Sequence, residues 1–466
     1  MARLIEGGGV KARSEWLAAM LPLGLTAAMV AAGLGGWLTW VFTPVALTVG
    51  LWLYERAPSR GFLRFCYVLW MVAPFVRRLA DWQGGRHDLN PIMLAPALVT
   101  GLGLLSALRA GPQLFGRGFL PFSVAALACL YGGALGLSQG LGAAALFGLL
   151  NALAPVALAI HILVLRRDAD HAAAAVFNTL AWGGMAMGAY AVLQYLSPPP
   201  WDVAWMRTAE IASIGRPEPL QVRVFGTMNA PGPFAVMMSA CVLAMLAGAG
   251  GRARWLGGLA GGAALVLSLV RSAWGGLIVG VGVLAALGSA RRRLRYLAAG
   301  GALLVVGTAL LAFGPGEGVR SRIGGLARLD QDVSLQQRAT FHAEMTMEVL
   351  ANPVGRGLGG TGVATRLSTE GAELGARGSF DSGILDLLFT YGWAGAVMLA
   401  AVVAIAVGAL RSGGSGAGAQ LAAAIVIETT VQLLFFNVLG GATGMLVFPV
   451  AALALALADP ECGARA

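Results

Sequence analysis

Long apolar segments, separated by short polar ones, make up most of the chain and predict a bundle of membrane-spanning helices. A helix needs about 20 mostly apolar residues to cross a bilayer, and the apolar runs suffice for about fourteen crossings. By residue number, the predicted crossings are 16–34, 36–54, 62–76, 92–108, 119–137, 141–165, 172–196, 234–249, 255–270, 273–287, 297–313, 384–410, 421–437 and 442–457. We therefore expect an all-α, polytopic membrane protein with about 12–14 transmembrane helices.

The placement of basic residues between these segments predicts their orientation, because positive charges gather on the cytoplasmic side of membrane helices. With a cytoplasmic N-terminus, one face collects most of the basic positions: Arg3, Lys11, Arg13, Arg56, Arg60, Arg64, Arg109, Arg117, Arg166, Arg167, Arg252, Arg254, the cluster at 291–295, Arg411 and Arg465. Arg77, Arg78 and Arg86 are the exception. They make the third segment a candidate interfacial helix instead of a crossing.

Three segments that are far apart in the sequence emerge together on the opposite, outer face in this topology. They are residues 197–233, the tip at Arg271 and the long polar segment 314–383. The predicted regions are N-terminal transmembrane helices (1–196), a central transmembrane region with the Arg223 and Arg271 motifs (197–313), one long outer-face loop (314–383) and C-terminal transmembrane helices (384–466).

Composition supports the membrane assignment and narrows the choice of partners. The chain is 58% hydrophobic and 12% charged, with a mean hydropathy of +0.75, whereas soluble domains carry about 25% charged residues. The formal charge of +10 is almost wholly arginine, but these positions lie between apolar segments and form no basic stripe, so no nucleic acid partner is expected. The cysteines lack C-x-x-C spacing and the histidines are scattered, so we expect no metal site and no cofactor.

The motif QVRVFGTMNAPGPFA at residues 221–235 is the main candidate for chemistry. Its Gly-Thr turn and Asn-Ala-Pro-Gly-Pro run suit a polar mouth at the start of a helix. Arg223 can meet an anion there beside backbone N–H groups, as helix N-termini do for phosphate. Thr227 and Asn229 are candidate substrate-binding residues of the same turn. Downstream, Arg271 stands alone in LSLVRSAWGGL as a second cation at a membrane boundary.

The long outer loop contains a predicted helix and a glycine-rich turn. Residues 334–351 have capping-box spacing at the start, an apolar i, i+4 repeat and an Asn-Pro stop, and they place Arg338 in the first helical turn. GRGLGGTG at 355–362 contains a formal G-x-G-x-x-G, but no βαβ unit surrounds it, so it fails as a dinucleotide site. We interpret it as a flexible turn that offers Arg356 to a ligand.

Acidic and aromatic positions leave structural and functional interpretations open. Asp381 is either the N-cap of the following helix or a carboxylate that accepts a proton from a sugar hydroxyl. Glu428 is an acid within a predicted crossing. It is either a functional residue or a polar residue that packs against another polar helix. Residues 201–214 read as an interfacial helix anchored by Trp201 and Trp205.

Four motifs in the second half of the chain resemble the bacterial O-antigen ligase and Wzy-type polymerase superfamily, and most closely its exopolysaccharide polymerases. They are RVFGTMNAPGPFA from Arg223, SLVRSAWGG from Ser268, RATFHAE followed by NPVGRGLG between Arg338 and Gly359, and FDSGILDLLFTYGWAG from Phe380. The first half of the chain resembles the family in hydropathy only.

The resemblance implies a metal-independent, multi-span glycosyltransferase of the GT-C type, with its active site on the periplasmic face of the bacterial inner membrane. The donor would be a glycan on undecaprenyl diphosphate, gripped by Arg223 and Arg271, with Asp381 in the active site. The implied partners are the lipid-linked donor, a glycan acceptor, the bilayer, and the flippase and chain-length regulator of the same pathway. No cofactor is implied.

Two departures favour the polymerase branch over the ligase branch. Ligases typically carry histidine where this chain has Asp381, and commonly Asn-Pro-Asn where it has Asn229-Ala230-Pro231. The alternatives are a ligase that transfers glycan to a lipid or protein acceptor, and a transporter or flippase that uses Arg223, Arg271 and Asp386. Transport ranks lower, because no paired halves with broken helices are visible in the sequence.

Overall fold

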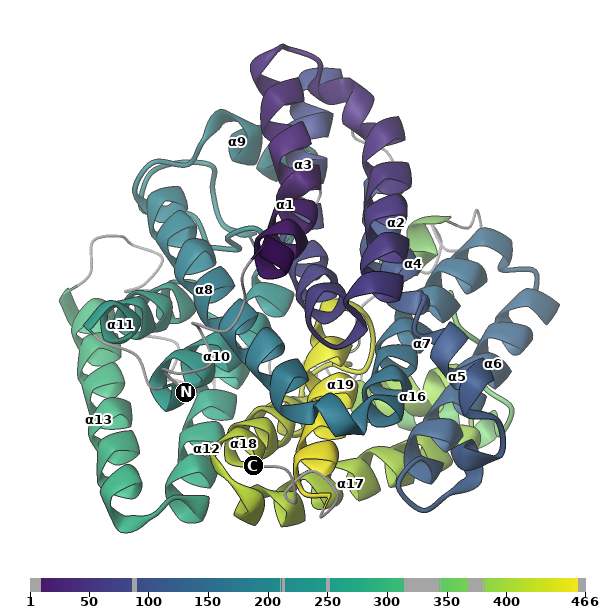
Figure 1. The fold of residues 1–466 in the computed structure, drawn as a ribbon. Coiled ribbons are helices and arrows are strands. Elements are labelled where there is room, and N and C mark those ends of the chain that lie inside the picture. Colours follow the sequence, from purple (N-terminus) through teal and green to yellow (C-terminus); the bar gives the residue numbers. More distant parts are fainter. Residues whose placement is uncertain are drawn as a thin grey trace.

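The structure is a computed structural model that describes residues 10–85, 90–209, 211, 214–248, 252–313, 343, 345–367, 380 and 382–459. Within these ranges the secondary structure is helical, apart from one isolated bridge between Gly215 and Val222 (Figure 1). The all-α prediction is therefore confirmed for the described chain.

The first half contains α1 (Val10–Ala31), α2 (Leu38–Arg56), α3 (Leu63–Gly84), α4 (Ala95–Gly101), α5 (Leu104–Ala110), α6 (Leu120–Ser138), α7 (Gly142–Val164), α8 (Ala169–Leu196) and α9 (Pro200–Thr208). The second half contains α10 (Pro231–Ala247), α11 (Arg252–Leu267), α12 (Arg271–Leu287), α13 (Ala290–Phe313), α16 (Gly383–Tyr391), α17 (Ala394–Ser412), α18 (Ala417–Val431) and α19 (Gly441–Leu457). The short helices η4 (Pro91–Leu94), η9 (Gly362–Leu367) and η12 (Gln432–Leu434) lie between them.

Nine helical segments in the described part of the chain are long and apolar enough to cross a membrane. They are Ser14–Ala31, Gly35–Arg56, Pro91–Phe115, Leu120–Ser138, Gly142–Val164, Arg166–Leu196, Ala290–Leu310, Ala394–Ser415 and Ala417–Leu434. Four shorter apolar helices are Pro231–Ala247, Ala253–Leu267, Arg271–Leu287 and Gly441–Leu457. These segments coincide with predicted crossings, and the chain is a polytopic helical membrane protein.

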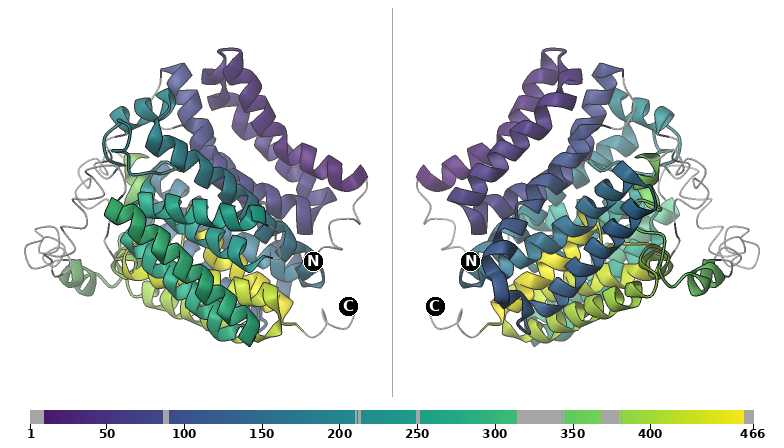
Figure 2. Two further views of the ribbon diagram at one scale, coloured as in Figure 1. Left: turned by 90° about the vertical axis from the view of Figure 1, so that its left-hand side faces the viewer. Right: turned by 90° about the vertical axis from the view of Figure 1, so that its right-hand side faces the viewer.

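Two almost wholly buried helices, α10 and α19, form the centre of the bundle. Both consist mainly of Ala, Val, Leu and Met and carry no charge, and a helix that is apolar all round is stable when other helices surround it. α19 packs against α7, α17 and α18, while α10 packs against α8, α11 and α12 (Figure 1). The α1–α2 hairpin lies at the periphery and tilts away from the other helices (Figure 2).

The third predicted crossing is the clearest difference from the sequence-based prediction. α3 extends to Gly84 and buries Arg78, which contacts Asp202 on α9, and Asp81, which contacts Asn90. It is therefore longer than the predicted segment 62–76, and most of its residues are buried in the bundle. Two other crossings are interrupted, 92–108 between α4 and α5 and 384–410 between α16 and α17. At the second break, Gly392 has φ +58°, and a Cβ there would lie 2.1 Å from Pro353 O. The backbone of Pro353 and Val354 therefore approaches closely at this break.

Candidate functional site

A buried charge network fixes the central motif from one side. Arg78 on α3 is 1% exposed, and its guanidinium donates to the Asp202 carboxylate on α9 and to Gly226 O at 2.6 Å. Asp202 also accepts hydrogen bonds from Tyr190 and Gln194 on α8, both at 2.7 Å. These contacts pair both buried charges, which makes the network compatible with a low-dielectric interior.

The same network holds the backbone of the motif. The amide oxygen of Gln194 accepts hydrogen bonds from Phe225 N at 2.9 Å and Gly226 N at 3.0 Å. Arg78 binds the carbonyl of Gly226 as well. The Gly-Thr turn is thereby held through its N–H and C=O groups, which leaves its side chains to serve other contacts. No sequence pattern predicted this network, although the unusual position of Arg78 in the predicted topology was a signal.

The other flank of the motif meets the turn between α11 and α12. The Arg223 guanidinium donates through Nε to Ser268 O at 3.2 Å and through Nη2 to Leu269 O at 3.3 Å. Leu269 has φ +56°, a backbone conformation that leucine rarely adopts. Arg271 follows this turn as the first residue of α12. The two arginines predicted as the main site therefore belong to one local structure.

The position of Arg271 is electrostatically unfavourable unless an anion is nearby. A helix N-terminus carries a partial positive charge, so it prefers acidic side chains or bound anions. No acidic residue occupies the first turn of α12. In the described part of the chain, no hydrogen bond or ion pair of the half-buried Arg271 side chain is found. This turn therefore offers positive potential for an anionic group.

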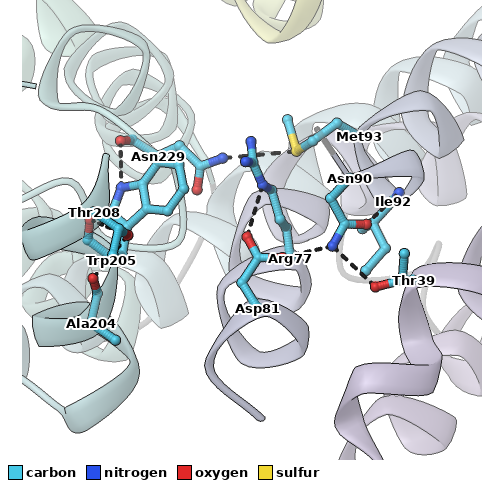
Figure 3. Close-up of polar contacts among 10 residues, drawn as sticks. All are labelled: Thr39, Arg77, Asp81, Asn90, Ile92, Met93, Ala204, Trp205, Thr208 and Asn229. Carbon is cyan, nitrogen blue, oxygen red and sulfur yellow. Dashed lines mark hydrogen bonds and ion pairs between the residues drawn. The ribbon is translucent and has the colours of Figure 1, made fainter. Parts of the chain in front are cut away.

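The polar side chains of the Gly-Thr-Met-Asn turn contact neighbouring helices. Thr227 donates its hydroxyl hydrogen to Met71 O at 2.6 Å. Asn229 lies between two elements: its amide nitrogen is 3.8 Å from the sulfur of Met93, and its carbonyl accepts from the Trp205 indole at 3.1 Å (Figure 3). The side-chain oxygen of Asn229 is buried without a hydrogen-bond partner. Asn229 thus retains an acceptor, whereas the Thr227 hydrogen is already used.

Arg77 lies beside Asn229 and was not predicted as a site residue (Figure 3). Its Nε donates to Asp81 at 3.1 Å, and its guanidinium lies over the Trp205 ring at 4.9 Å. Asp81 also accepts from the Asn90 amide at 2.8 Å. Trp205 is 5% exposed, so the prediction that it anchors an interfacial helix is wrong. α9 instead covers the motif.

The glycine-rich turn is packed tightly against other helices, so the prediction of a flexible turn is also wrong. Arg356 N donates to Phe389 O at 2.9 Å, and Gly357 N donates to Thr390 O at 2.8 Å. Gly357 has φ +74°, and a Cβ there would lie 2.2 Å from Gly136 N. The glycines therefore permit backbone contact with α6 and α16. The Arg356 side chain projects outward and pairs with Glu348 at 3.2 Å.

The start of α16 bears on the alternative in which Asp381 is the N-cap of the helix. Ser382 is the N-cap of α16, and its hydroxyl accepts from Leu385 N at 3.3 Å. Closing this helix end is therefore the role of Ser382. Asp381 itself and Arg338 lie outside the described residues. Nearby, Asp386 is buried and accepts a hydrogen bond from the Asn437 amide at 2.7 Å.

Contacts between distant segments join these features at one end of the bundle. The predicted clustering of these segments on an outer face stays a prediction. The linking contacts are Arg223 with Ser268, Gly276 with Gln432, Gly383 with Phe436, Leu358 with Gly136, and Arg366 with Ala209. Arg223 and Arg271 therefore share one local structure, while the Arg356 turn packs against α6 and α16.

No set of three His, Cys, Asp or Glu side chains arranged for a metal ion occurs among the described residues. The side chains gathered at this end are arginines, amides and hydroxyls, which recognise anions and sugar hydroxyls by hydrogen bonding. In comparisons with known proteins, no protein-family model matches the chain, and no curated protein matches it in sequence.

Proposed function

We propose that the protein polymerises undecaprenyl-diphosphate-linked oligosaccharide repeat units into exopolysaccharide or O-antigen. The observation that carries this proposal is the contact of the Arg223 guanidinium with the carbonyls of Ser268 and Leu269, in the turn that begins α12 with Arg271. Two cations and a helix N-terminus at one polar turn suit a diphosphate, since arginine binds phosphate oxygens in bidentate fashion.

The proposed chemistry is a single displacement. The acceptor hydroxyl oxygen bonds to the anomeric carbon of the donor sugar, while the bond from that carbon to the lipid diphosphate breaks. Arg223 and Arg271 stabilise the negative charge that develops on the departing diphosphate. Asp381 is the proposed acceptor of the hydroxyl proton. The proposal includes no metal ion or cofactor.

Substrate contacts are assigned to Asn229, Thr227, Arg338 and Arg356. Asn229 is the strongest of these, because its side-chain oxygen is buried without a partner and can accept from a sugar hydroxyl. Arg356 projects outward from a rigid turn, as a ligand-binding group should. Thr227 retains only its acceptor lone pairs, because its hydrogen goes to Met71 O.

In this proposal the protein is a GT-C-type enzyme with 12–14 crossings in the bacterial inner membrane. Residues 314–383 form its periplasmic loop, and the flippase and chain-length regulator of the same pathway are its partners. The support is the order of the helices, which places Arg223, Arg271 and the start of α17 at helix ends opposite to those of Arg166, Arg252 and Arg411, as the positive-inside rule expects.

The test is glycosyl transfer by the purified full-length protein with lipid-diphosphate-linked repeat units, in chelator and without added metal. A ladder of glycan lengths on the lipid carrier is the expected result, and Asp381→Asn should abolish it. Transfer of glycan only when a second acceptor is added would replace the polymerase with a ligase. Absence of transfer under every condition would contradict glycosyl transfer altogether.

A further inference from the structure

A second polar cluster lies inside the bundle and contains a buried acid without a basic partner. Glu428 on α18 is 0% exposed. Its carboxylate oxygens both lie 2.8 Å from the Ser239 hydroxyl on α10, and the Thr429 hydroxyl is 3.5 Å from Oε1. Across the described residues, no arginine, lysine or histidine forms an ion pair with Glu428. An isolated ionised carboxylate in such a place is strongly unfavourable.

The hydroxyl groups around Glu428 supply too few hydrogens for its two oxygens. Thr429 Oγ1 donates its hydrogen to Ile425 O at 2.7 Å, and Ser239 Oγ also lies 3.0 Å from Val236 O. Because each hydroxyl has one hydrogen, only that of Ser239 remains for the carboxylate. The cluster therefore contains more acceptor oxygens than hydrogens, so it needs a further hydrogen-bond donor, a proton or a cation.

Gln432 gives an independent indication that a small ligand belongs here. It is 0% exposed, and neither its amide oxygen nor its amide nitrogen has a hydrogen-bond partner. Buried amides are nearly always satisfied by protein, water or an ion. A Cβ at Gly276 of α12 would lie 2.9 Å from Gln432 Nε2 and 3.0 Å from Glu428 Oε2. The glycine therefore lets these two side chains converge on the α12 backbone.

Among the described residues, the helices packed against α18 bring no basic side chain into an ion pair with Glu428. On α10, Cys241 lies close enough to interact with it electrostatically. α19 carries no titratable residue, and on α17 Arg411 lies in the last turn. On α12, Arg271 is five positions before Gly276, which places it about 140° around the helix from the face that meets α18.

We propose that Glu428, Ser239 and the Gln432 amide, turned so that its oxygen and not Nε2 faces the Glu428 carboxylate, bind one Na⁺ ion, with Thr429 Oγ1 as a further oxygen ligand. One monovalent cation neutralises one carboxylate, whereas a divalent ion would leave a buried excess charge. All four groups are oxygen ligands, which hard cations prefer. A proton would also neutralise the carboxyl group, but it would leave the Gln432 amide oxygen without a partner, whereas a cation can bind that oxygen as well as the carboxylate. The site is separate from the arginine turn and does not depend on the proposed glycosyl transfer.

The test is the thermal unfolding midpoint of the purified full-length protein in NaCl, KCl and choline chloride at one pH and one ionic strength. Bound ligand stabilises the folded state in proportion to the logarithm of its concentration above Kd. We expect the Tm to rise with Na⁺ by several degrees beyond the two control salts. Glu428→Gln should remove the response, since it keeps the shape and removes the charge. Glu348→Gln, which changes an acid of the outer loop, should keep the response.

A direct count of bound radioactive Na⁺ completes the experiment, with one ion per chain expected and none in Glu428→Gln. If Glu428→Gln fails to fold, Gly276→Ala is the second variant, because its methyl group would intrude between Glu428 and Gln432. Equal Tm values in the three salts, or a Tm that follows pH but not Na⁺, would overturn the proposal. An unchanged Na⁺ response in Glu428→Gln would do the same.

Discussion

Arg78 and Arg271 flank the same polar motif, yet their surroundings differ completely. Arg78 is 1% exposed and donates to the Asp202 carboxylate, which Tyr190 and Gln194 also bind. Arg271 is half-buried at the start of α12, and its side chain has no acid or carbonyl partner in the described ranges. Since a buried charge must be paired, Arg78 holds the fold together. Arg271 is the arginine available for an anion. The motif is therefore fixed on the flank of Arg78, whereas the flank of Arg271 can bind an anion.

The largest predicted effect comes from breaking the fixed flank. Asp202→Asn leaves the buried Arg78 without its counter-charge, and we expect the free energy of unfolding to fall by about 3–5 kcal/mol. The Tm in detergent and the rate of limited proteolysis both measure this loss. Asp168→Asn is the control, because Asp168 is exposed. A Tm equal to that of the parent would show that Arg78 does not depend on Asp202.

The flank of Arg271 should respond in activity and not in stability. Arg271→Ala and Arg223→Ala each remove a cation from the proposed leaving-group site, and we expect product formation to fall by about 100-fold or more. The amount of protein in the membrane should stay unchanged. Arg216→Ala is the matched control, because Arg216 is an exposed arginine of the same segment. Full activity in both Arg271→Ala and Arg223→Ala would end the diphosphate hypothesis.

The same comparison shows what sequence patterns can predict. The grouping of Arg223 with Arg271 followed from counting apolar segments and from the positive-inside rule, because both depend on local composition. The pairing of Arg78 with Asp202 joins residues 124 positions apart, and no periodicity encodes such a contact. The prediction for Trp205 was wrong for the same reason. An amphipathic pattern predicts that one face of a helix is buried, but it does not show what covers that face.

A smaller effect is expected where the glycine-rich turn at 355–362 packs on the bundle. Gly357 has φ +74°, and a Cβ there would lie 2.2 Å from Gly136 N, so Gly357→Ala forces the loop backbone away from α6. We expect a loss of about 1–3 kcal/mol in stability. Gly360→Ala is a close control, because its nearest neighbour would be 3.6 Å away. Equal Tm values for the two variants would contradict the packed-turn description.

The smallest stability effect is expected at Arg356, where the rigid loop presents a charge to solvent. Its ion pair with Glu348 is 3.2 Å long, and the Arg356 side chain is 51% exposed, so Arg356→Ala and Glu348→Ala should each change stability by less than about 1 kcal/mol. If Arg356 binds the donor, Arg356→Ala raises the KM for lipid-linked glycan several-fold, while Glu348→Ala leaves it unchanged. Each substitution breaks the same ion pair, but only Arg356→Ala removes the cation. If the two variants have equal KM values, Arg356 therefore has a structural role and does not bind the donor.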